Sequence, residues 1–220
     1  MMGKVTAIIP ARGGSKGIVN KNISILGGRP LIYYALEACK KTKEIGTIVV
    51  TTDSNLIEST VLEKYPDTVI IRRPDKLSND SATSEDALLH AIKVLDSQSS
   101  NLDKILFVQA TSPLTLSRDL SQLIYMLEKH DSAAFYTEDY GFFFDLDDLH
   151  NPRLPRQQRE PRKREAGNAW AFSKKGFLKH KTRLFGDIAL CKLDYPSELE
   201  IDTPSDLSVI ESIMNVNSIS

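Results

Sequence analysis

The sequence predicts an α/β fold with a mostly parallel β-sheet covered by helices on both faces, and two observations support this class. Short β-branched apolar runs, such as residues 5–9, 47–52 and 105–108, alternate with longer segments of helical periodicity. Strands separated by helices pair in parallel, because each connection crosses over the sheet. The 220 residues suit a single domain, 1–220, with an inserted arm at about 138–166.

The first part of the chain keeps this rhythm. The run Val5-Thr6-Ala7-Ile8-Ile9 is almost wholly apolar, which is typical of a strand buried on both faces. We expect Pro30 in the first turn of a helix and Ser117 as a helix cap. The elements expected after Pro30 are a strand at 47–52, a helix near 55–65, a strand at 69–71, a helix at 84–95, a strand at 105–108, a helix from 117 to about 129 and a strand at 133–136.

The rhythm breaks between residues 138 and 165, which contain three prolines, the triplet Phe142-Phe143-Phe144 and a basic stretch from Arg153 to Arg164. We expect a loop or extended arm there, and no regular βα unit. Strands resume at 169–172 and 188–191. A last helix is expected at Thr203-Pro204-Ser205-Asp206, with Thr203 as its cap and Asp206 favoured by the helix dipole.

Composition excludes several classes of protein. Lys and Arg number 28 against 29 Asp and Glu, so the net charge of -1 offers no broad basic surface and we expect no nucleic-acid partner. The first ten residues do not resemble a signal peptide, and no apolar run approaches the roughly 18 residues that span a membrane. Cys39 and Cys191 have no metal-ligand spacing, so we expect two core thiols in a cytoplasmic protein.

A glycine-rich basic loop, Arg12-Gly13-Gly14-Ser15-Lys16-Gly17, follows the first strand. Open α/β sheets bind ligands at the carboxyl ends of their strands. Glycines let backbone amides turn toward an anion, and Arg12, Lys16 and Lys21 add cationic donors. The spacing matches neither GxGxxG nor GxxxxGK[ST]. The loop therefore predicts a polyphosphate site of another kind, the alternative being a plain turn with solvated lysines.

A longer match gives this loop a family. The run from Ile9 to Gly17, followed by Lys21-Asn22, resembles the acylneuraminate cytidylyltransferases, the CMP-sialic acid synthetase family. The likeness continues in order through Thr51-Thr52-Asp53, Arg73-Pro74, residues 80–84, residues 109–114, Arg156-Gln157 and Ile201-Asp202-Thr203. It implies an enzyme with a Rossmann-like three-layer fold that transfers CMP from CTP to an acidic nonulosonate with Mg²⁺, and a small dimerisation arm exchanged across a homodimer.

The resemblance assigns roles on the nucleotide side. Arg12 and Lys21 would be catalytic, because they would hold the triphosphate and neutralise its charge. The nucleotide-binding residues would be Arg12, Gly13, Ser15, Lys16, Asn22, Arg73, Ala82 and Ser84. Arg73, Ala82 and Ser84 fall where the family reads the cytosine edge. Without the resemblance, Arg73 could be a surface residue and Ser84 a helix cap.

On the sugar side, the resemblance points to Gln109, Arg156, Gln157 and Arg164. A Gln side chain both donates and accepts, and the planar fork of Arg suits a carboxylate, although the arm's arginines could also be a solvated charge run. Two stretches depart from the family. They are Phe142-Phe143-Phe144-Asp145, and Ala166-Gly167-Asn168-Ala169-Trp170 in place of Asn-Gly-Ala-Ile-Tyr. The nucleotide is thus better defined than the sugar, and neuraminic, legionaminic and pseudaminic acid all stay open.

Glu200 and Asp202 are the candidate magnesium ligands. They stand two residues apart before the last helix, so an extended chain points both carboxylates the same way. Mg²⁺ takes hard oxygen ligands, usually one or two carboxylates with substrate phosphates and water. The family places two aspartates here, and this chain has Glu at the first. The alternative is that Asp202 supports the helix start and Glu200 is solvated.

Two other functions compete with this interpretation. The first is another sugar nucleotidyltransferase such as a CMP-Kdo synthetase, but those enzymes usually begin with a Ser-x-Arg-Leu-Pro-Gly-Lys loop. The second is a catalytically silent homologue that binds sugar nucleotides, which the altered arm suggests. No residue marks itself as a general base, since the histidines lie outside the matched motifs, at His90, His130, His150 and His180.

Overall fold

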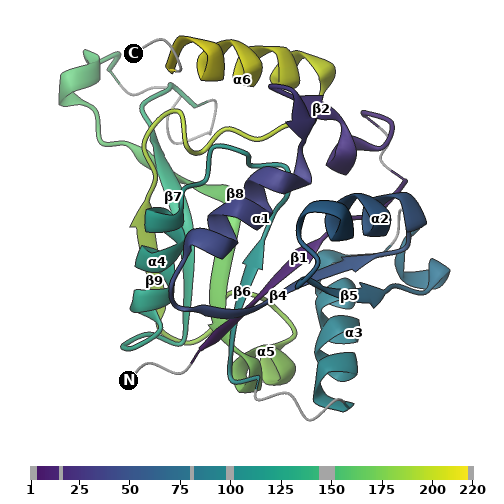
Figure 1. Ribbon diagram of the computed structural model, residues 1–220. Coiled ribbons are helices and arrows are strands. Elements are labelled where there is room, and N and C mark those ends of the chain that lie inside the picture. The colour runs from purple at the N-terminus through teal and green to yellow at the C-terminus, as the bar shows by residue number, and fades with distance from the viewer. Residues whose placement is uncertain (1–3, 15–16, 80–81, 98–101, 144–151, 218–220) are drawn as a thin grey trace.

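The structure is a computed structural model that describes residues 4–14, 17–79, 82–97, 102–143 and 152–217. A seven-stranded sheet lies at its centre, in the order β5-β4-β1-β6-β8-β7-β9 (Figure 1). Its strands are β1 (Val5–Pro10), β4 (Ile45–Thr52), β5 (Val69–Arg72), β6 (Lys104–Val108), β7 (Ser132–Asp139), β8 (Arg162–Ser173) and β9 (Ile188–Lys192). A separate hairpin pairs β2 (Ile25–Leu26) with β3 (Arg29–Pro30).

The sheet is mostly parallel, as the sequence predicts. β1 pairs in parallel with β4 and β6, β4 with β5, and β7 with β9. β8 runs antiparallel to both of its neighbours, β6 and β7. β1 is buried from Val5 to Ile9 in the middle of the sheet, so the carboxyl ends of β1, β4 and β6 meet at one edge.

Helices cover both faces of the sheet, which gives the three-layer fold. They are α1 (Ile32–Lys41), α2 (Asn55–Lys64), α3 (Ser84–Ser97), α4 (Ser117–Met126), α5 (Lys174–His180) and α6 (Pro204–Asn217). Buried side chains of α1, α2 and α4 share one core, and those of α3 and α5 share the other. α6 packs with the β2–β3 hairpin through Leu26, Leu31 and Ile210, and Figure 1 shows it beside β2. No helix among the described residues has both the length and the apolarity to cross a bilayer.

The predicted start of the last helix is confirmed. Thr203 Oγ1 accepts a hydrogen bond from Asp206 N at 3.3 Å, and Asp206 Oδ2 accepts from Thr203 N at 2.7 Å, so the two residues cap α6 reciprocally. Two other starts were predicted wrongly. Pro30 pairs in β3 instead of entering α1, and Ser117 is the first residue of α4 rather than its cap.

The arm contains more regular structure than its prolines indicate. β7 continues to Asp139 and β8 begins at Arg162, so the two strands form a ribbon at the base of the arm. Opposite charges face each other there, because Glu138 pairs with Lys163 and Asp139 with Arg162. Such cross-strand pairs stabilise an antiparallel ladder. The 3-10 helix η3 (Arg156–Gln158) lies in the arm, at the upper left of Figure 1.

The arm's own arginines cover its aromatic rings. Arg153 and Arg159 lie over the ring of Phe142, at 4.5 and 4.3 Å from its centroid. Arg162 lies over Phe143 at 4.3 Å. Phe144 and Asp145 lie outside the described residues. These stacks use the ring faces that a simple apolar patch would leave exposed.

Candidate active site

A cleft of about 440 Å³ opens at the sheet edge where β1 and β6 end, and it gathers residues that lie far apart in the sequence. Its lining residues are Pro10, Arg12, Gly17, Lys21, Asn22, Arg73, Ala82, Thr83, Ser84, Ala87, Gln109, Thr111 and Asp202. Most of the predicted nucleotide residues are therefore in one cavity, together with one predicted sugar residue and one predicted metal ligand. Ser15 and Lys16 lie outside the described residues.

Hydrogen bonds hold the first loop against the end of β4 and against Asn22, which follows the loop. Ala11 N donates to Thr51 O at 3.0 Å, and Gly13 N donates to Asp53 Oδ1 at 2.9 Å. Asn22 is buried, and its Nδ2 donates to Arg12 O at 2.9 Å. Gly13 thus contacts Asp53 and does not line the cleft, whereas Arg12 and Asn22 do.

Arg73 lines the cleft and is only 8% exposed, so it is no ordinary surface residue. Its Nη2 donates to Thr51 O at 2.7 Å, and its backbone N donates to Thr52 O at 2.8 Å. Burial lowers the pKa of Arg73, while the nearby charge of Asp53 raises it and that of Arg12 lowers it. Arg73 remains a cation at neutral pH, because free guanidinium has a pKa far above 7.

Ser84 opens α3 beside Arg73, but it is not the helix cap. The cap is Thr83, whose Oγ1 accepts from Asp86 N at 3.1 Å while Asp86 Oδ2 accepts from Thr83 N at 3.0 Å. The alternative interpretation of Ser84 as a cap is therefore wrong. Ser84 and Ala82 line the same cavity as Arg73, so the structure brings together the three residues predicted to contact the base.

Lys21 joins the first loop to the segment before α6. Its Nζ donates to Ile201 O at 3.0 Å and to Asp202 Oδ1 at 2.9 Å. The two walls also touch at Gly17, where a Cβ atom would lie 2.5 Å from Asp202 O. The Asp202 side chain is 72% exposed on the cleft, so its carboxylate is accessible to a ligand.

Glu200 does not join Asp202 in the lining of the cleft, so the structure does not bring the two predicted metal ligands into one cavity. The Glu200 Oε1 accepts from Gly167 N at 3.0 Å. Burial raises the pKa of Glu200, the Gly167 amide lowers it, and the charge of Asp202 raises it, so the two carboxylates sense each other. The described residues contain no group of three or more His, Cys, Asp or Glu side chains that could hold a metal.

A bulge in β8 positions the segment that carries Glu200 and Asp202. Ala134 of β7 pairs with Trp170 and Phe135 pairs with Ala166, so residues 167–169 have no partner in β7. Within the bulge, the Asn168 Nδ2 donates to Thr115 Oγ1 at 2.8 Å and to Ser197 O at 2.7 Å. The bulge therefore anchors the chain just before Glu200. Sequence reasoning noted this stretch only as a departure from the family.

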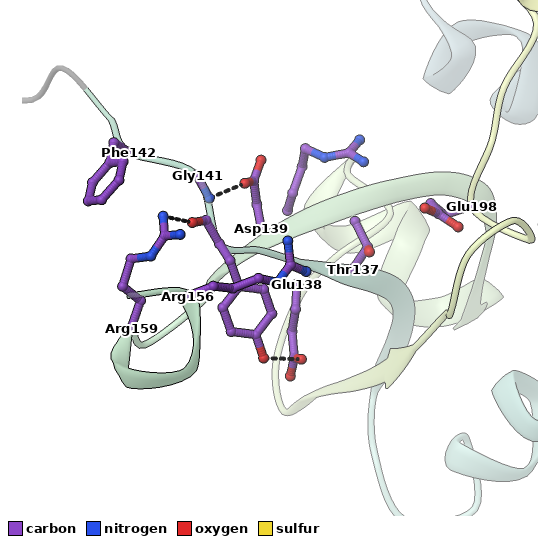
Figure 2. Close-up of a pocket in the computed structure, with 10 residues that line it drawn as sticks. Thr137, Glu138, Asp139, Gly141, Phe142, Arg156, Arg159 and Glu198 are labelled. Atoms are coloured by element: carbon purple, nitrogen blue, oxygen red, sulfur yellow. Dashed lines mark hydrogen bonds between the residues drawn. The ribbon is translucent and has the colours of Figure 1, made fainter. Parts of the chain in front are cut away.

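The predicted sugar residues are divided between two places. Gln109 lines the nucleotide cleft. Arg156 and Arg164 instead line a hollow of about 480 Å³ at the base of the arm, and Figure 2 shows Arg156 and Arg159 on one side of it and Glu198 on the other. Gln157 lines an adjoining hollow of about 540 Å³. The structure does not bring these three residues into the cleft of their own chain.

The hollow at the base of the arm has a mixed charge. Arg156 lies over the ring of Tyr140 at 4.6 Å, and Arg159 donates a short hydrogen bond to Tyr140 O. The Tyr140 hydroxyl donates to Glu138 at 3.1 Å, and Lys192 donates to the same carboxylate at 2.7 Å. The Lys192 contact, followed by that of Tyr140, lowers the pKa of Glu138. These contacts hold the arm against β7 and β9.

Comparison with known proteins agrees with the family resemblance of the residues that line the cleft. A family model described as cytidylyltransferase matches residues 6–217. The N-acylneuraminate cytidylyltransferase of Escherichia coli O18:K1:H7 is 29% identical over 231 residues, which cover 97% of this chain and 52% of that protein. The pseudaminic acid cytidylyltransferase of Campylobacter jejuni serotype O:23/36 is 28% identical over 228 residues, covering 97% of each. The chain spans about half the length of the N-acylneuraminate relatives it matches.

Solved structures share the fold. A CMP:2-keto-3-deoxy-manno-octonic acid synthetase complexed with CTP aligns with a TM-score of 0.74 and 16% identity, covering 97% of this chain and 99% of that one. A 4-diphosphocytidyl-2C-methyl-D-erythritol synthase from Anaerococcus prevotii aligns with a TM-score of 0.69 and 21% identity over the same shares. These likenesses concern architecture alone. Because the family match extends over residues 6–217, this protein belongs to the cytidylyltransferase family.

Proposed function

We propose that this protein transfers CMP from CTP to an acidic nonulosonate sugar and releases pyrophosphate. The observation that carries the proposal is the single cleft that joins Arg12 and Lys21 to Arg73 and Ser84. The anomeric hydroxyl of the sugar attacks the α-phosphorus, and the bond from that phosphorus to the bridging oxygen breaks. Arg12 and Lys21 bind the triphosphate and neutralise the charge that gathers on the leaving pyrophosphate.

The acceptor class rests on the names of the relatives and on Gln109. Relatives named for N-acylneuraminate and for pseudaminic acid match nearly the whole chain. Gln109 lies at the end of β6 in the same cleft as the nucleotide residues, within 3.4 Å of Thr111 Oγ1. An amide there can both donate to and accept from the hydroxyl and acylamino groups of such sugars.

We also propose that Mg²⁺ assists, held by Asp202 with Glu200 as the second carboxylate. Asp202 fits, because its exposed carboxylate lines the cleft, although a metal would have to share that carboxylate with Lys21, whose Nζ lies 2.9 Å away. Glu200 fits less directly, since one of its oxygens accepts from Gly167 N. Bound Mg²⁺ would supply positive charge to the phosphates. We expect Asp202→Asn to abolish metal-dependent turnover without unfolding the protein, and Glu200→Asp to retain or raise activity. An Asp202→Asn enzyme with the parent's magnesium dependence and rate contradicts this assignment.

The arm suggests that the enzyme acts as a homodimer. Arg156, Gln157 and Arg164 lie outside their own chain's cleft, and Phe142 remains 46% exposed despite its stacks. We propose that the arm packs on a second copy and brings its arginines to that copy's sugar. A fully active monomer at micromolar concentration is incompatible with this arrangement.

The buried, free thiols of Cys39 and Cys191 fit a cytoplasmic enzyme.

The deciding experiment measures pyrophosphate release from CTP with a panel of acceptors. The panel contains neuraminic, legionaminic and pseudaminic acids, with Kdo as the competing acceptor. Release with one of the nonulosonates supports the proposal and identifies the sugar. Release with Kdo alone favours the other nucleotidyltransferase class. CTP binding without release for any acceptor indicates a catalytically silent homologue.

A further inference from the structure

The motif Thr51-Thr52-Asp53 ends β4 and has no part in the function proposed above, yet it joins the two halves of the cleft. Thr51 O accepts two hydrogen bonds, from Ala11 N at 3.0 Å and from Arg73 Nη2 at 2.7 Å. Thr52 O accepts a third, from Arg73 N at 2.8 Å. Ala11, which leads into the loop at 12–17 (called the phosphate loop below), and Arg73 are therefore fixed to adjacent peptide groups of β4.

Asp53 extends this connection to the phosphate loop through its side chain. Its Oδ1 accepts from Gly13 N at 2.9 Å, one residue after Arg12. Packing supports the same contact, because a Cβ atom on Gly13 would lie only 3.0 Å from Ser54 Cβ. The beginning of the loop is thus held against the end of β4 both by a charge-assisted hydrogen bond and by close approach.

The charge of Asp53 makes its position informative. The cleft collects the cations Arg12, Lys21 and Arg73, which suits a triphosphate. A carboxylate beside such a site repels the ligand, since like charges raise the free energy of binding. Asp53 is therefore expected to provide a compensating benefit, and its hydrogen bond from Gly13 N points to orientation of that residue as the benefit.

We propose that Asp53 is a positioning residue that orients the phosphate loop before CTP binds. The inference rests on the proposed function and adds a residue to it. Fixing the loop in advance removes part of the ordering cost of binding. Arg73 senses the charge of Asp53, which raises its pKa, but its hydrogen bonds go to main-chain oxygens of β4. Loss of Asp53 should consequently weaken ligands in proportion to their phosphates.

The test compares the affinities of CTP and CMP by calorimetric titration. Asp53→Ala should weaken CTP binding about tenfold, the size of one charge-assisted hydrogen bond, and should change CMP binding less than about twofold. Asp53→Asn keeps an acceptor for Gly13 N and should stay within about threefold of the parent for CTP. Asp53→Leu keeps the side chain's shape without an acceptor, so it should behave like Asp53→Ala and serves if that variant does not fold.

Ser54→Ala is the matched control. It keeps the Cβ that faces Gly13 and removes the hydroxyl that caps α2 at 3.4 Å from Ile57 N. It should lower the melting temperature and leave the CTP to CMP affinity ratio unchanged. An Asp53→Ala protein with the parent's ratio, or one that loses both ligands equally, overturns the positioning role. A parent protein that binds no CTP overturns the proposed function, and this inference with it.

Discussion

The cleft and the arm hold their arginines in different ways. In the cleft, Arg73 is buried and donates to a main-chain oxygen, as Arg12 does to Asn79 O at 3.3 Å. In the arm, arginines lie over aromatic rings at 4.3–4.6 Å, namely Arg153, Arg156, Arg159 and Arg162, and Arg159 also donates to a main-chain oxygen, Tyr140 O. A hydrogen bond to the backbone fixes direction, whereas an exposed cation–π contact contributes only about 0.5–1 kcal/mol and permits sliding. The cleft is therefore a rigid frame, and the arm can adapt.

The largest effect should come from the cleft. Lys21→Ala removes a donor from the triphosphate site and leaves Asp202 without its cation. Loss of a charged hydrogen bond costs about 1.5–3 kcal/mol, so kcat/KM for CTP should fall roughly ten- to hundredfold, and Arg12→Ala should act similarly. Lys41→Ala, which removes a surface ion pair with Glu37, is the control. Unchanged turnover in both cleft variants means that the phosphates bind elsewhere.

A second substitution tests whether the frame includes the β8 bulge. In Gly167→Ala, the new Cβ would lie 2.5 Å from Glu200 Oε1, so the carboxylate must leave the Gly167 amide. The free energy of unfolding should fall by about 1–3 kcal/mol, the cost of an unpaired polar group, as measured by chemical denaturation. Gly14→Ala is the comparison, because nothing lies within 4 Å of its Cβ. Equal stability of the two variants would contradict a tight bulge.

Removing a stack in the arm should have a smaller effect on stability. Phe142→Leu abolishes the contacts with Arg153 and Arg159, each worth about 0.5–1 kcal/mol at an exposed site. We expect CTP affinity to stay within about twofold of the parent, while KM for the sugar rises. Titration with CTP and steady-state kinetics with the sugar separate the two effects. A parallel loss of CTP affinity would mean that the arm and the cleft are one unit.

The smallest effect should be a pH dependence of stability on the cleft side. Burial lowers the pKa of His90 below its ordinary 6.5, and Arg73, Lys76 and Lys93 lower it further. The unfolded chain therefore binds a proton more readily, so stability is lost as pH falls below about 6.5 toward the folded-state value. Denaturation between pH 7.5 and 5 should show a steeper loss for the parent than for His90→Gln. Identical slopes would show that folding does not lower the pKa of His90.

The strands that lead to the cleft were predictable from local pattern, whereas the place of Arg73 in the site came from the resemblance to a family. The apolar run at Val5–Ile9 and the motifs around Arg12, Arg73 and Asp202 lie where the fold joins them at the edge of the sheet. The β8 bulge was not predictable, since it depends on the register between β7 and β8 and on the contact between Gly167 and Glu200. Its one signal was Gly167, which stands just before the strand predicted at 169–172.

The arm was predicted less well for a related reason. Its prolines indicated a loop, but β7 and β8 pair as a ribbon in which Glu138 and Asp139 stand opposite Lys163 and Arg162. Such pairs become visible only once the register is known. Likewise, Asp53 was noticed as part of a motif, but only its hydrogen bond to Gly13 N indicates a role.

The ion pair between Lys21 and Asp202, 2.9 Å long at the edge of the cleft, has a consequence for which charged ligands can bind there. Each side chain is the other's counter-ion, so a ligand that binds one of them must separate the two. A lone anion that binds Lys21 leaves Asp202 without its ion-pair partner, and a lone cation that binds Asp202 leaves Lys21 without its partner. A polyanion that arrives together with its own cation satisfies both at once. Under the proposed function, we therefore expect the pair to disfavour single ions, such as free phosphate, and to favour a nucleotide that enters together with its metal ion.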